Sequence, residues 1–383
     1  MRKERVNGKK NIYLLGSSSL FNDVGSEMIE PILPFYITAL GGSGATVGLI
    51  SGLRTGIPGL VKIFSGWLSD KIGKRKIFVS IGYFFSVIFK FILAFASSWK
   101  SVIFSASFER VGKLRDPPRD AIIADSTKKR GKGFAIQQTF DRLGAVIGSL
   151  LVLFLFWKLN LNIKTLIIIA AVLSAFSLIP LIFVKEPRFK KTNKGIFEGI
   201  ANLSQPLKLF IAAATIYALA DFGLYMFLIL RANQITNSII IPLALYAASN
   251  LIYASLLVRF GKLSDKIGKK KVILAGYVLF IAMTASFVFV SSLSSLIVLF
   301  MLYGVVSAII QANQRALVAD LSGSAKGTSL GLFHATTGII AIPAGLIAGL
   351  LWNISHSLMF SYLAVIAFIA VITLIVFVKE KRQ

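Results

Sequence analysis

The sequence has no cysteine among its 383 residues, which excludes disulfide bonds, thiolate metal ligands and palmitoylated side chains. Acidic residues are scarce, because 16 Asp and Glu stand against 42 Lys and Arg. No stretch matches the phosphate-binding pattern Gly-x-x-x-x-Gly-Lys-Ser/Thr, so we do not expect ATP to supply energy. The basic start is not followed by a cleavage site of small residues. We therefore expect the first apolar segment to be a retained helix rather than a signal peptide.

Apolar side chains are what the sequence has in abundance. Hydrophobic residues make up 56% of the chain, and the mean hydropathy is +0.77. A soluble protein of this length could not cover so much apolar surface. The apolar runs are about twenty residues long, which suits helices that cross a bilayer and excludes the roughly ten-residue strands of a membrane barrel. The sequence therefore predicts an all-α membrane protein.

Hydrophobic stretches separated by turn signals predict twelve transmembrane helices. Their approximate ranges are 11–40, 45–68, 77–98, 101–125, 133–157, 163–185, 207–233, 238–261, 272–291, 294–321, 327–352 and 356–378. Several connections are very short, for example residues 41–44, and such loops force neighbouring helices to pack antiparallel.

The distribution of the basic residues explains the net charge of +26. Most of them lie in the first ten positions, in alternate loops and after residue 378, whereas the intervening loops hold only Lys100, Lys158 and Lys164. This positive-inside pattern predicts a multi-pass protein of the cell membrane with both termini in the cytoplasm. It also predicts contacts with anionic membrane lipids and argues against nucleic acid as a partner.

The two halves of the chain repeat one another. The segment 66–76, Gly-Trp-Leu-Ser-Asp-Lys-Ile-Gly-Lys-Arg-Lys, recurs at 261–271 as Gly-Lys-Leu-Ser-Asp-Lys-Ile-Gly-Lys-Lys-Lys. Ala-Ile-Ile-Ala-Asp at 121–125 recurs at the same offset as Ala-Leu-Val-Ala-Asp at 316–320. Asp23-Val-Gly also has a counterpart, Asp221-Phe-Gly, at a slightly larger offset. Both copies of the long motif lie on the same side of the membrane, so the doubling is parallel.

The repeat predicts three parts. They are an N-terminal six-helix bundle at 1–185, a cytoplasmic central linker at 186–206 and a C-terminal six-helix bundle at 207–383. The linker is the longest polar stretch of the chain, which is why we place the boundary there.

At these motifs the sequence resembles the major facilitator superfamily, whose most specific motif is Gly-x-Leu-(Ser/Ala)-Asp-(Lys/Arg)-x-Gly-(Lys/Arg)-(Lys/Arg). The resemblance covers the whole chain and implies two six-helix bundles, alternating access and a cavity lined by the first, fourth, seventh and tenth helices. In the fifth helix, Gly144 and Gly148 followed by Ser149 resemble the Gly-x-x-x-Gly-Pro motif of the drug–proton antiporter branch, with serine in place of proline.

The first helix carries three acids, Asp23, Glu27 and Glu30, at a spacing that places them on one face within about 60°. Asp23 is expected near the middle of the membrane, where an ionised carboxylate costs about 2.5 kcal/mol or more. Such groups should face a cavity, pair with a base or bind a proton, so we predict a role in proton coupling. The alternative is that they neutralise Arg54, Lys90 and the arginines of the fourth helix.

The fourth helix is unusually charged. A regular helix would place Glu109, Lys113, Asp116 and Asp120 on one face and Arg115 and Arg119 on another, although Pro117 and Pro118 interrupt it. Arg115 or Arg119 could clamp an anionic substrate, because guanidinium binds such groups bidentately. The alternative role is as counter-ions for the acids of the spans. The candidate substrate or counter-ion residues here are Arg110, Arg115, Asp116, Arg119 and Asp120, with Arg54 in the second helix.

Other spans add further candidates. Asp141 shares a face of the fifth helix with Gly144 and Gly148, whose small size allows close helix packing. Asp221 is the candidate proton-coupling acid of the second half. The tenth helix offers a substrate surface at Gln311, Asn313, Gln314 and Arg315.

The repeated loops suggest a cytoplasmic gate. By the resemblance, Asp70 and Arg75 together with Asp125 would form a latch, and Asp265, Lys270 and Asp320 would be its counterpart. Gly66 and Gly261 are expected to allow close backbone contact. The alternative is that the loops set the topology and cap the following helices.

These observations predict a monomeric secondary active transporter, working by alternating access without cofactor or metal. Proton-coupled efflux of a small organic solute or drug is the main prediction, and proton-coupled uptake of a small anion or polar metabolite is the alternative. A channel is disfavoured because the latch motifs imply alternating states. An enzyme is disfavoured because the sequence shows neither a metal cluster nor a nucleophile–base pair.

Overall fold

The computed structural model describes residues 2–127, 130–186, 203–322 and 326–378, and in these ranges all regular structure is helical. Side chains are described for residues 9–127, 132–186, 203–322 and 328–378. The predicted linker, 186–206, lies mostly outside the described residues.

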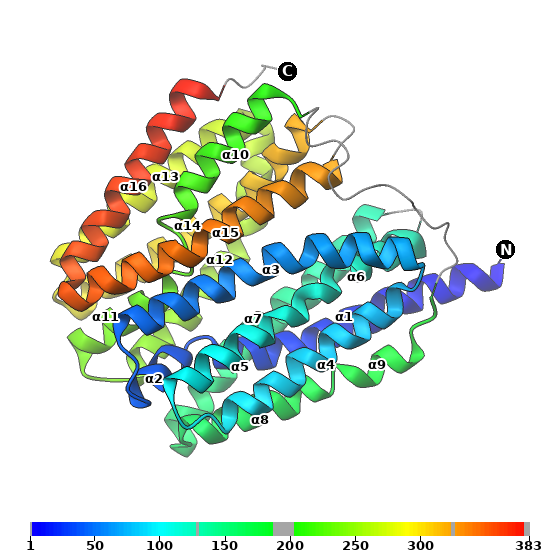
Figure 1. Ribbon diagram of the computed structural model, residues 1–383, viewed down its shortest axis with the longest axis horizontal. Helices are drawn as coiled ribbons and strands as arrows, with labels where there is room; N and C mark the ends of the chain where they lie inside the picture. The colour runs from blue at the N-terminus through cyan, green and yellow to red at the C-terminus, as the bar shows by residue number, and fades with distance from the viewer. Residues whose placement is uncertain (1, 128–129, 187–202, 323–325, 379–383) are drawn as a thin grey trace. The chain divides into compact units, whose positions relative to one another are not determined.

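The helices follow the order expected from the apolar runs (Figure 1). In the first half they are α1 (Arg2–Ile29), α2 (Leu33–Ala39), α3 (Gly44–Ile72), α4 (Arg75–Ala94), α5 (Trp99–Val111), the 3₁₀ helix η1 (Gly112–Arg115), α6 (Asp116–Ser126), α7 (Arg130–Leu159), α8 (Ile163–Ala175) and α9 (Leu178–Phe183). In the second half they are α10 (Gln205–Ala218), α11 (Tyr225–Thr236), α12 (Ile240–Ile267), α13 (Lys269–Phe289), α14 (Leu293–Leu321), α15 (Lys326–Ile354) and α16 (His356–Phe377).

In the described residues, three of the twelve predicted spans are interrupted and do not qualify as single apolar helices, and the sixth is interrupted only by a turn between α8 and α9. Within the described residues, nine helices are long and apolar enough to cross a membrane, and they correspond to the other nine spans. The first span divides into α1 and α2, the fourth into α5, η1 and α6, and the seventh into α10 and α11. All three belong to the set that the family resemblance places around a cavity. Irregular backbone inside a membrane is tolerated where it is buried in protein or lines a cavity.

Proline and glycine account for these interruptions. Pro34 lies in the first turn of α2, and Pro117 lies in the first turn of α6. A proline suits the start of a helix because its missing N–H would have no partner there. Between α10 and α11, Gly223 has a φ of +96°, a conformation that favours glycine.

The described chain forms two compact units. The first comprises residues 1–40 and 60–196, and the second comprises 41–59 and 197–383. The division falls inside α3, next to Pro58 within that helix. The boundaries predicted from the repeat, 1–185 and 207–383, stay a prediction.

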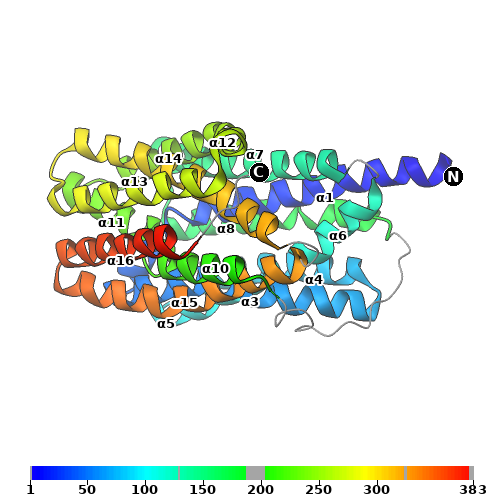
Figure 2. The same cartoon turned by 90° about the horizontal axis from the view of Figure 1, so that it is seen from above.

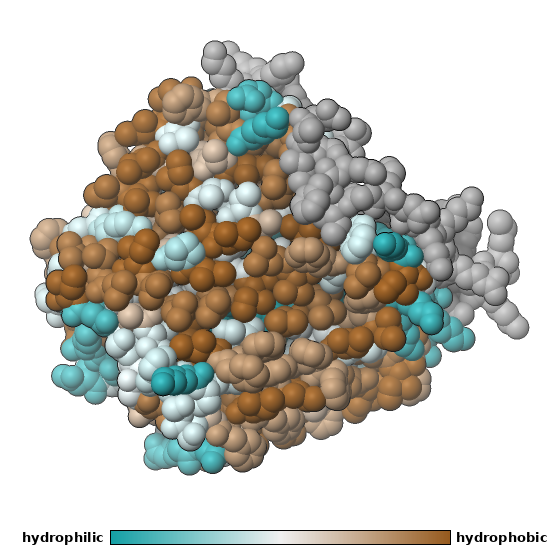
Figure 3. Space-filling model, in the orientation of Figure 1, coloured by the Kyte–Doolittle hydropathy of each residue, from teal (hydrophilic) through white to brown (hydrophobic). Residues whose placement is uncertain are grey.

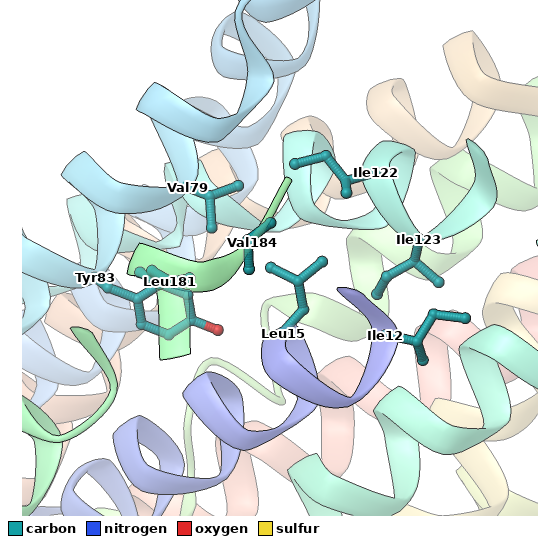
Figure 4. Close-up of a cluster of buried hydrophobic side chains, with 8 residues drawn as sticks. All are labelled: Ile12, Leu15, Val79, Tyr83, Ile122, Ile123, Leu181 and Val184. Carbon is teal, nitrogen blue, oxygen red and sulfur yellow. The ribbon is translucent and has the colours of Figure 1, made fainter. Parts of the chain in front are cut away.

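The first unit is built on α1, which packs along α7 and α8, while α4 packs against α5 and α8. Small residues allow the close approach of α1 and α7. A Cβ atom added to Gly148 would lie 2.4 Å from the carbonyl oxygen of Val24. A buried apolar cluster joins four helices and the segment after α9 (Figure 4): Ile12, Leu15, Val79, Tyr83, Ile122, Ile123, Leu181 and Val184.

In the second unit, α12 packs along α14, and α13 contacts both α14 and α16 (Figure 2). Large apolar side chains are exposed on both units, for example Ile182 at 72% and Ile354 at 74%. The face drawn in Figure 3 is mainly hydrophobic. Such surfaces fit a lipid environment.

Candidate functional site

Charged side chains contact one another through the first unit, starting at the break between α1 and α2. Glu30 directly follows α1 and forms an ion pair with Arg110 of α5. Arg110 Nε lies 3.2 Å from Glu109 Oε2, and both Glu30 and Glu109 are buried. A buried carboxylate is tolerated when it has such a partner. The structure therefore brings Glu30 to the fourth span, as the counter-ion interpretation expects.

Lys90 of α4 is a fully buried cation of this unit, and sequence reasoning considered it only as a counter-ion. Its Nζ donates hydrogen bonds to Ser174 Oγ at 2.8 Å and to both Asn22 O and Asn22 Oδ1 at 3.1 Å. Glu109 Oε1 lies 3.9 Å away. The signal in the sequence was a lysine in the middle of the apolar run Val-Ile-Phe-Lys-Phe-Ile-Leu, which requires a buried acceptor set.

Arg115 of η1 lies between two carboxylates. Its Nη2 is 3.9 Å from Asp23 Oδ1 on α1, and its Nε is 3.9 Å from Asp116 Oδ1 on α6. The guanidinium group stacks on Tyr83 at 4.5 Å from the ring centroid, and Nη1 donates to Gly112 O at 2.9 Å. Arg115 is 1% exposed. It therefore joins α1, α4 and α6 through charge and stacking.

Asp116 has further cationic neighbours. Lys62 Nζ of α3 lies 2.9 Å from Asp116 Oδ2, and Arg119 Nη1 lies 3.7 Å from Asp116 Oδ1. Arg119 also contacts Asp120 at 3.0 Å and donates to Ser19 Oγ of α1 at 3.1 Å.

A regular helix would place the acids of the fourth span and two of its arginines, Arg115 and Arg119, on separate faces, but here they contact one another. Asp116 contacts both Arg115 and Arg119. Arg115 lies in the 3₁₀ turn η1, and Arg119 lies one turn after Asp116 within α6, a spacing at which side chains are neighbours.

On α7, Asp141 accepts a hydrogen bond from Gln137 at 2.8 Å. A Cβ atom on Gly144 would lie 3.0 Å from Asp23 Cβ, and one on Gly148 would lie 2.9 Å from Glu27 Cβ. The two glycines therefore let the acidic face of α1 lie directly against α7, as expected for helix-packing residues.

In the second unit, Asp221 lies where the seventh span is unwound. Its N–H donates to Tyr217 O at 3.1 Å, after which the chain leaves the helix until Tyr225. Ser51 Oγ donates to Gly223 O at 2.6 Å, and Thr55 Oγ1 donates to Phe222 O at 3.0 Å. These two hydroxyl groups of α3 satisfy carbonyl groups that a continuous helix would have paired internally. By contrast, Asp23 lies within continuous α1.

The tenth-span candidates differ in their contacts and burial. Gln314 Nε2 donates to Tyr277 Oη at 2.8 Å, and Tyr277 stacks on Tyr217 with ring centroids 4.0 Å apart. Asn313 is buried, whereas Gln311 is exposed and accepts a hydrogen bond from Tyr253. Arg315 is exposed, and Arg54 of α3 is buried.

The first repeated loop forms the expected group of charges. Arg75 lies 2.8 Å from Asp70 Oδ1 and 2.5 Å from Asp125 Oδ2. Glu186 accepts hydrogen bonds from the backbone N–H groups of Arg75 and Lys76. A Cβ atom on Gly66 would lie 3.2 Å from Pro117, so this glycine does allow a close contact.

The second loop differs by one residue. Lys269, rather than the expected Lys270, lies 3.2 Å from Asp265 and 2.7 Å from Asp320. Lys270 Nζ instead donates to the carbonyl groups of Ile375 and Val378 at the end of α16. Lys76 makes the matching bonds in the first half, to Ile182 O at 3.2 Å and Val184 O at 2.7 Å.

The shift has a simple cause. In the first loop, Lys74 separates the left-handed Gly73 from the start of α4, whereas in the second loop the left-handed Gly268 directly precedes α13. The second helix thus begins one residue earlier relative to the motif. The expected close contact at Gly261 is also wrong, since a Cβ atom there would meet nothing within 4 Å.

Comparisons with known proteins agree with this arrangement. The chain is 46% identical over 371 residues to an uncharacterized MFS-type transporter of Methanocaldococcus jannaschii. The aligned region covers 94% of this chain and 93% of that protein. It is 25% identical over 334 residues to the multidrug resistance protein MdtH of Baumannia cicadellinicola, covering 83% of this chain and 79% of the relative.

Solved structures share the fold. The nucleoside transporter NupG superposes with a TM-score of 0.78 at 14% identity, covering 97% of this chain and 100% of the other. The human organic anion transporter MFSD10 superposes with a TM-score of 0.72 at 16% identity, covering 96% and 99%. The predicted fold of twelve helices in two bundles is thereby confirmed. The family model of the Major Facilitator Superfamily matches residues 15–244 and 211–383. The chain therefore belongs to the major facilitator superfamily of membrane transporters.

Proposed function

We propose that the protein is a proton-coupled secondary transporter of the cell membrane that exports a small organic solute or drug in exchange for protons. The observation that carries this proposal is the position of Arg115, with Asp23 and Asp116 each 3.9 Å away on different helices. A guanidinium group shared between two carboxylates responds when either one changes its charge.

The proposed coupling step takes place at Asp23. Binding of a proton to its carboxylate removes the negative charge on α1, and Arg115 is then attracted to Asp116 alone. The separation of 3.9 Å is longer than a charge-assisted hydrogen bond, so this contact is easier to break than the 2.9 Å pair of Lys62 with Asp116. Proton binding thus weakens the attraction between α1 and η1. Solute release at one side of the membrane would follow from that change.

The proposed alternation uses the two charged loops. Arg75 with Asp70 and Asp125, and Lys269 with Asp265 and Asp320, would close the cytoplasmic end of each bundle in one state and separate in the other. Both termini and these loops are proposed to lie in the cytoplasm. Ion pairs that are partly exposed are weak enough to open during each cycle.

Efflux is favoured over uptake on two grounds. Curated relatives at about a quarter identity are named multidrug resistance proteins. The alternative of anion uptake requires a guanidinium group that can clamp substrate, but Arg115 and Arg119 already contact carboxylates of the protein. An anion would have to displace these partners.

The test uses purified protein in liposomes with an internal pH dye and a panel of ethidium, chloramphenicol and uridine. We expect an imposed pH gradient to accelerate the flux of at least one compound, with stoichiometric proton movement. Asp23→Asn should still exchange that compound between the two sides but lose the acceleration. Glu198→Gln, which removes a carboxylate of the predicted central linker, should keep it. Wild-type flux that does not respond to the gradient would contradict the proposal.

A further inference from the structure

Asp221 differs from four buried or partly buried acids of the first unit in its lack of a cation among the described residues. Asp23, Glu30, Glu109 and Asp116 each lie within 4 Å of an arginine or lysine. Among the described residues, the carboxylate of Asp221 has neither an ion pair nor a hydrogen-bond donor. It is only partly buried, near the middle of the segment formed by α10 and α11. An ionised carboxylate at that depth is unfavourable until a positive charge reaches it.

The backbone around Asp221 is held in a fixed shape. The left-handed Gly223 turns the chain, and the hydroxyl groups of Ser51 and Thr55 bind the carbonyl groups of Phe222 and Gly223. An unwound stretch that is satisfied in this way is ordered rather than melted. The side chain of Asp221 is therefore held at a defined position, as a binding group requires.

The surroundings of Asp221 are polar but uncharged. Tyr217 lies one turn earlier and is 3% exposed, and its hydroxyl group has no hydrogen-bond partner among the described residues. Its ring stacks on Tyr277, which Gln314 holds through a hydrogen bond.

We propose that Asp221 anchors the positive charge of an organic cation, which is the substrate class of the second unit. The inference rests on the proposed transport function and names its substrate. An inorganic ion such as Ca²⁺ needs about six oxygen ligands, and no cluster of metal-ligating side chains occurs among the described residues. A cation with an apolar body can be held by one carboxylate, and the neighbours of Asp221 in the chain, Ala220 and Phe222, are apolar. The Tyr217 hydroxyl supplies an additional acceptor.

The assignment explains why paired positions in the repeat differ. Asp23 and Asp221 occupy corresponding places in the two halves, but Asp23 has Arg115 beside it. A carboxylate next to a fixed arginine is already neutralised and binds an external cation poorly. The unpaired carboxylate of the other half is the one that can attract it.

The test compares two probes of one shape and opposite charge, tetraphenylphosphonium and tetraphenylborate. Their binding to purified protein in detergent micelles is measured by equilibrium dialysis without any gradient, after subtracting binding to empty micelles. We expect the phosphonium ion to bind and the borate ion not to bind specifically. Asp221→Asn should weaken phosphonium binding by about tenfold or more, because it removes one partner of a desolvated charge pair. Asp221→Glu keeps the charge and should retain most of the affinity.

Two outcomes would overturn the inference. One is wild-type protein that binds the phosphonium ion no better than the borate ion, and the other is unchanged affinity in Asp221→Asn. Glu186→Gln, which removes a carboxylate elsewhere, should leave binding unchanged. Size-exclusion profiles and unfolding temperatures show whether each variant is folded. Because no proton gradient is present, failure here leaves the proposed proton coupling standing, and failure of the liposome experiment leaves this binding result standing.

Discussion

The guanidinium group of Arg115 stacks on the ring of Tyr83, with its Cζ atom 4.5 Å from the ring centroid. Both side chains are almost completely buried, so the stacking is not weakened by water. Such a contact contributes about 0.5–2 kcal/mol. In this protein it also fixes the position of Arg115 between Asp23 and Asp116.

Replacing Tyr83 should therefore affect stability and coupling together. We expect Tyr83→Leu to lower the unfolding temperature and to reduce the response of flux to a pH gradient, because Arg115 loses the surface that positions it. Tyr83→Phe keeps the ring and should retain both properties. Thermal unfolding in detergent and flux in liposomes measure the two effects. Equal loss of coupling in both variants would show that the ring is not the positioning group.

Lys90 should be essential for stability. Lys90→Met leaves the acceptors of Asn22 and Ser174 without a donor and Glu109 without one of its cations. Breaking a buried pair in this way costs about 3–5 kcal/mol. Lys158→Met, at an exposed position, is the control. Adding Glu109→Gln to Lys90→Met should restore part of the loss in thermal unfolding, and full independence of the two changes would contradict the ion pair.

Replacing glycine by alanine should have opposite effects on stability at two positions. Gly148→Ala puts a methyl group 2.4 Å from Val24 O, so α1 and α7 must separate, and we expect a lower unfolding temperature. Gly261→Ala, inside α12, meets nothing within 4 Å. Alanine is favoured over glycine in a helix by about 1 kcal/mol, so this variant should be as stable as the wild type or more so. A destabilised Gly261→Ala would indicate a packing partner at that position.

The lysine assignment in the second loop can be tested with introduced thiols, because the chain has no native cysteine. Ser264 is a buried residue of α12 that matches Ser69 of α3, and Ser264→Cys introduces a thiol there. Combining Lys269→Gln with Ser264→Cys should speed labelling by a water-soluble thiol reagent severalfold, since Asp265 and Asp320 lose their shared cation. Combining Lys270→Gln with the same thiol should change it little. The reverse order of effects would assign the gate to Lys270.

The hydroxyl groups of α3 that bind the unwound segment should be required for cation binding. Ser51→Ala with Thr55→Val leaves the carbonyl group of Phe222 without a side-chain donor and that of Gly223 with only the N–H of Met226 at 3.5 Å; an unsatisfied buried group costs about 1–3 kcal/mol. We expect weaker tetraphenylphosphonium binding in the double variant. Thr139→Ala, whose hydroxyl bonds within its own helix, is the matched control. Unchanged affinity would mean that these bonds do not position Asp221.

Much of the fold could be predicted from the sequence, because bilayer-spanning helices are dictated by length and hydropathy. The interruption of the fourth span was also visible, since Pro117 and Pro118 are incompatible with a helix interior. The interruption at Asp221 was not. Asp23-Val-Gly and Asp221-Phe-Gly read alike, yet Gly25 lies in a helix and Gly223 is left-handed. Hydroxyl groups of another span, far away in sequence, decide the difference.

The site residues show the same limit. Asp23, Glu30 and Asp116 were identifiable as charges that need partners, but their partners depend on how a 3₁₀ turn rotates the fourth span. Lys269 takes the role expected of Lys270 because α13 starts one residue early relative to the motif. The motif itself does not show where the helix starts. Lys90 was visible as a lone charge, whereas its acceptors on α1, α5 and α8 required the structure.

One helix, α3, carries contacts of both proposed sites. Ser51 and Thr55 hold the segment beside Asp221, and Lys62 of the same helix pairs with Asp116. Thr55 and Lys62 are two turns apart, about 10 Å along the axis. The helix that holds the backbone beside Asp221 thus also supplies a cation to Asp116. Pro58 lies between Thr55 and Lys62 and removes one backbone hydrogen bond from α3. The helix therefore bends most easily at this residue.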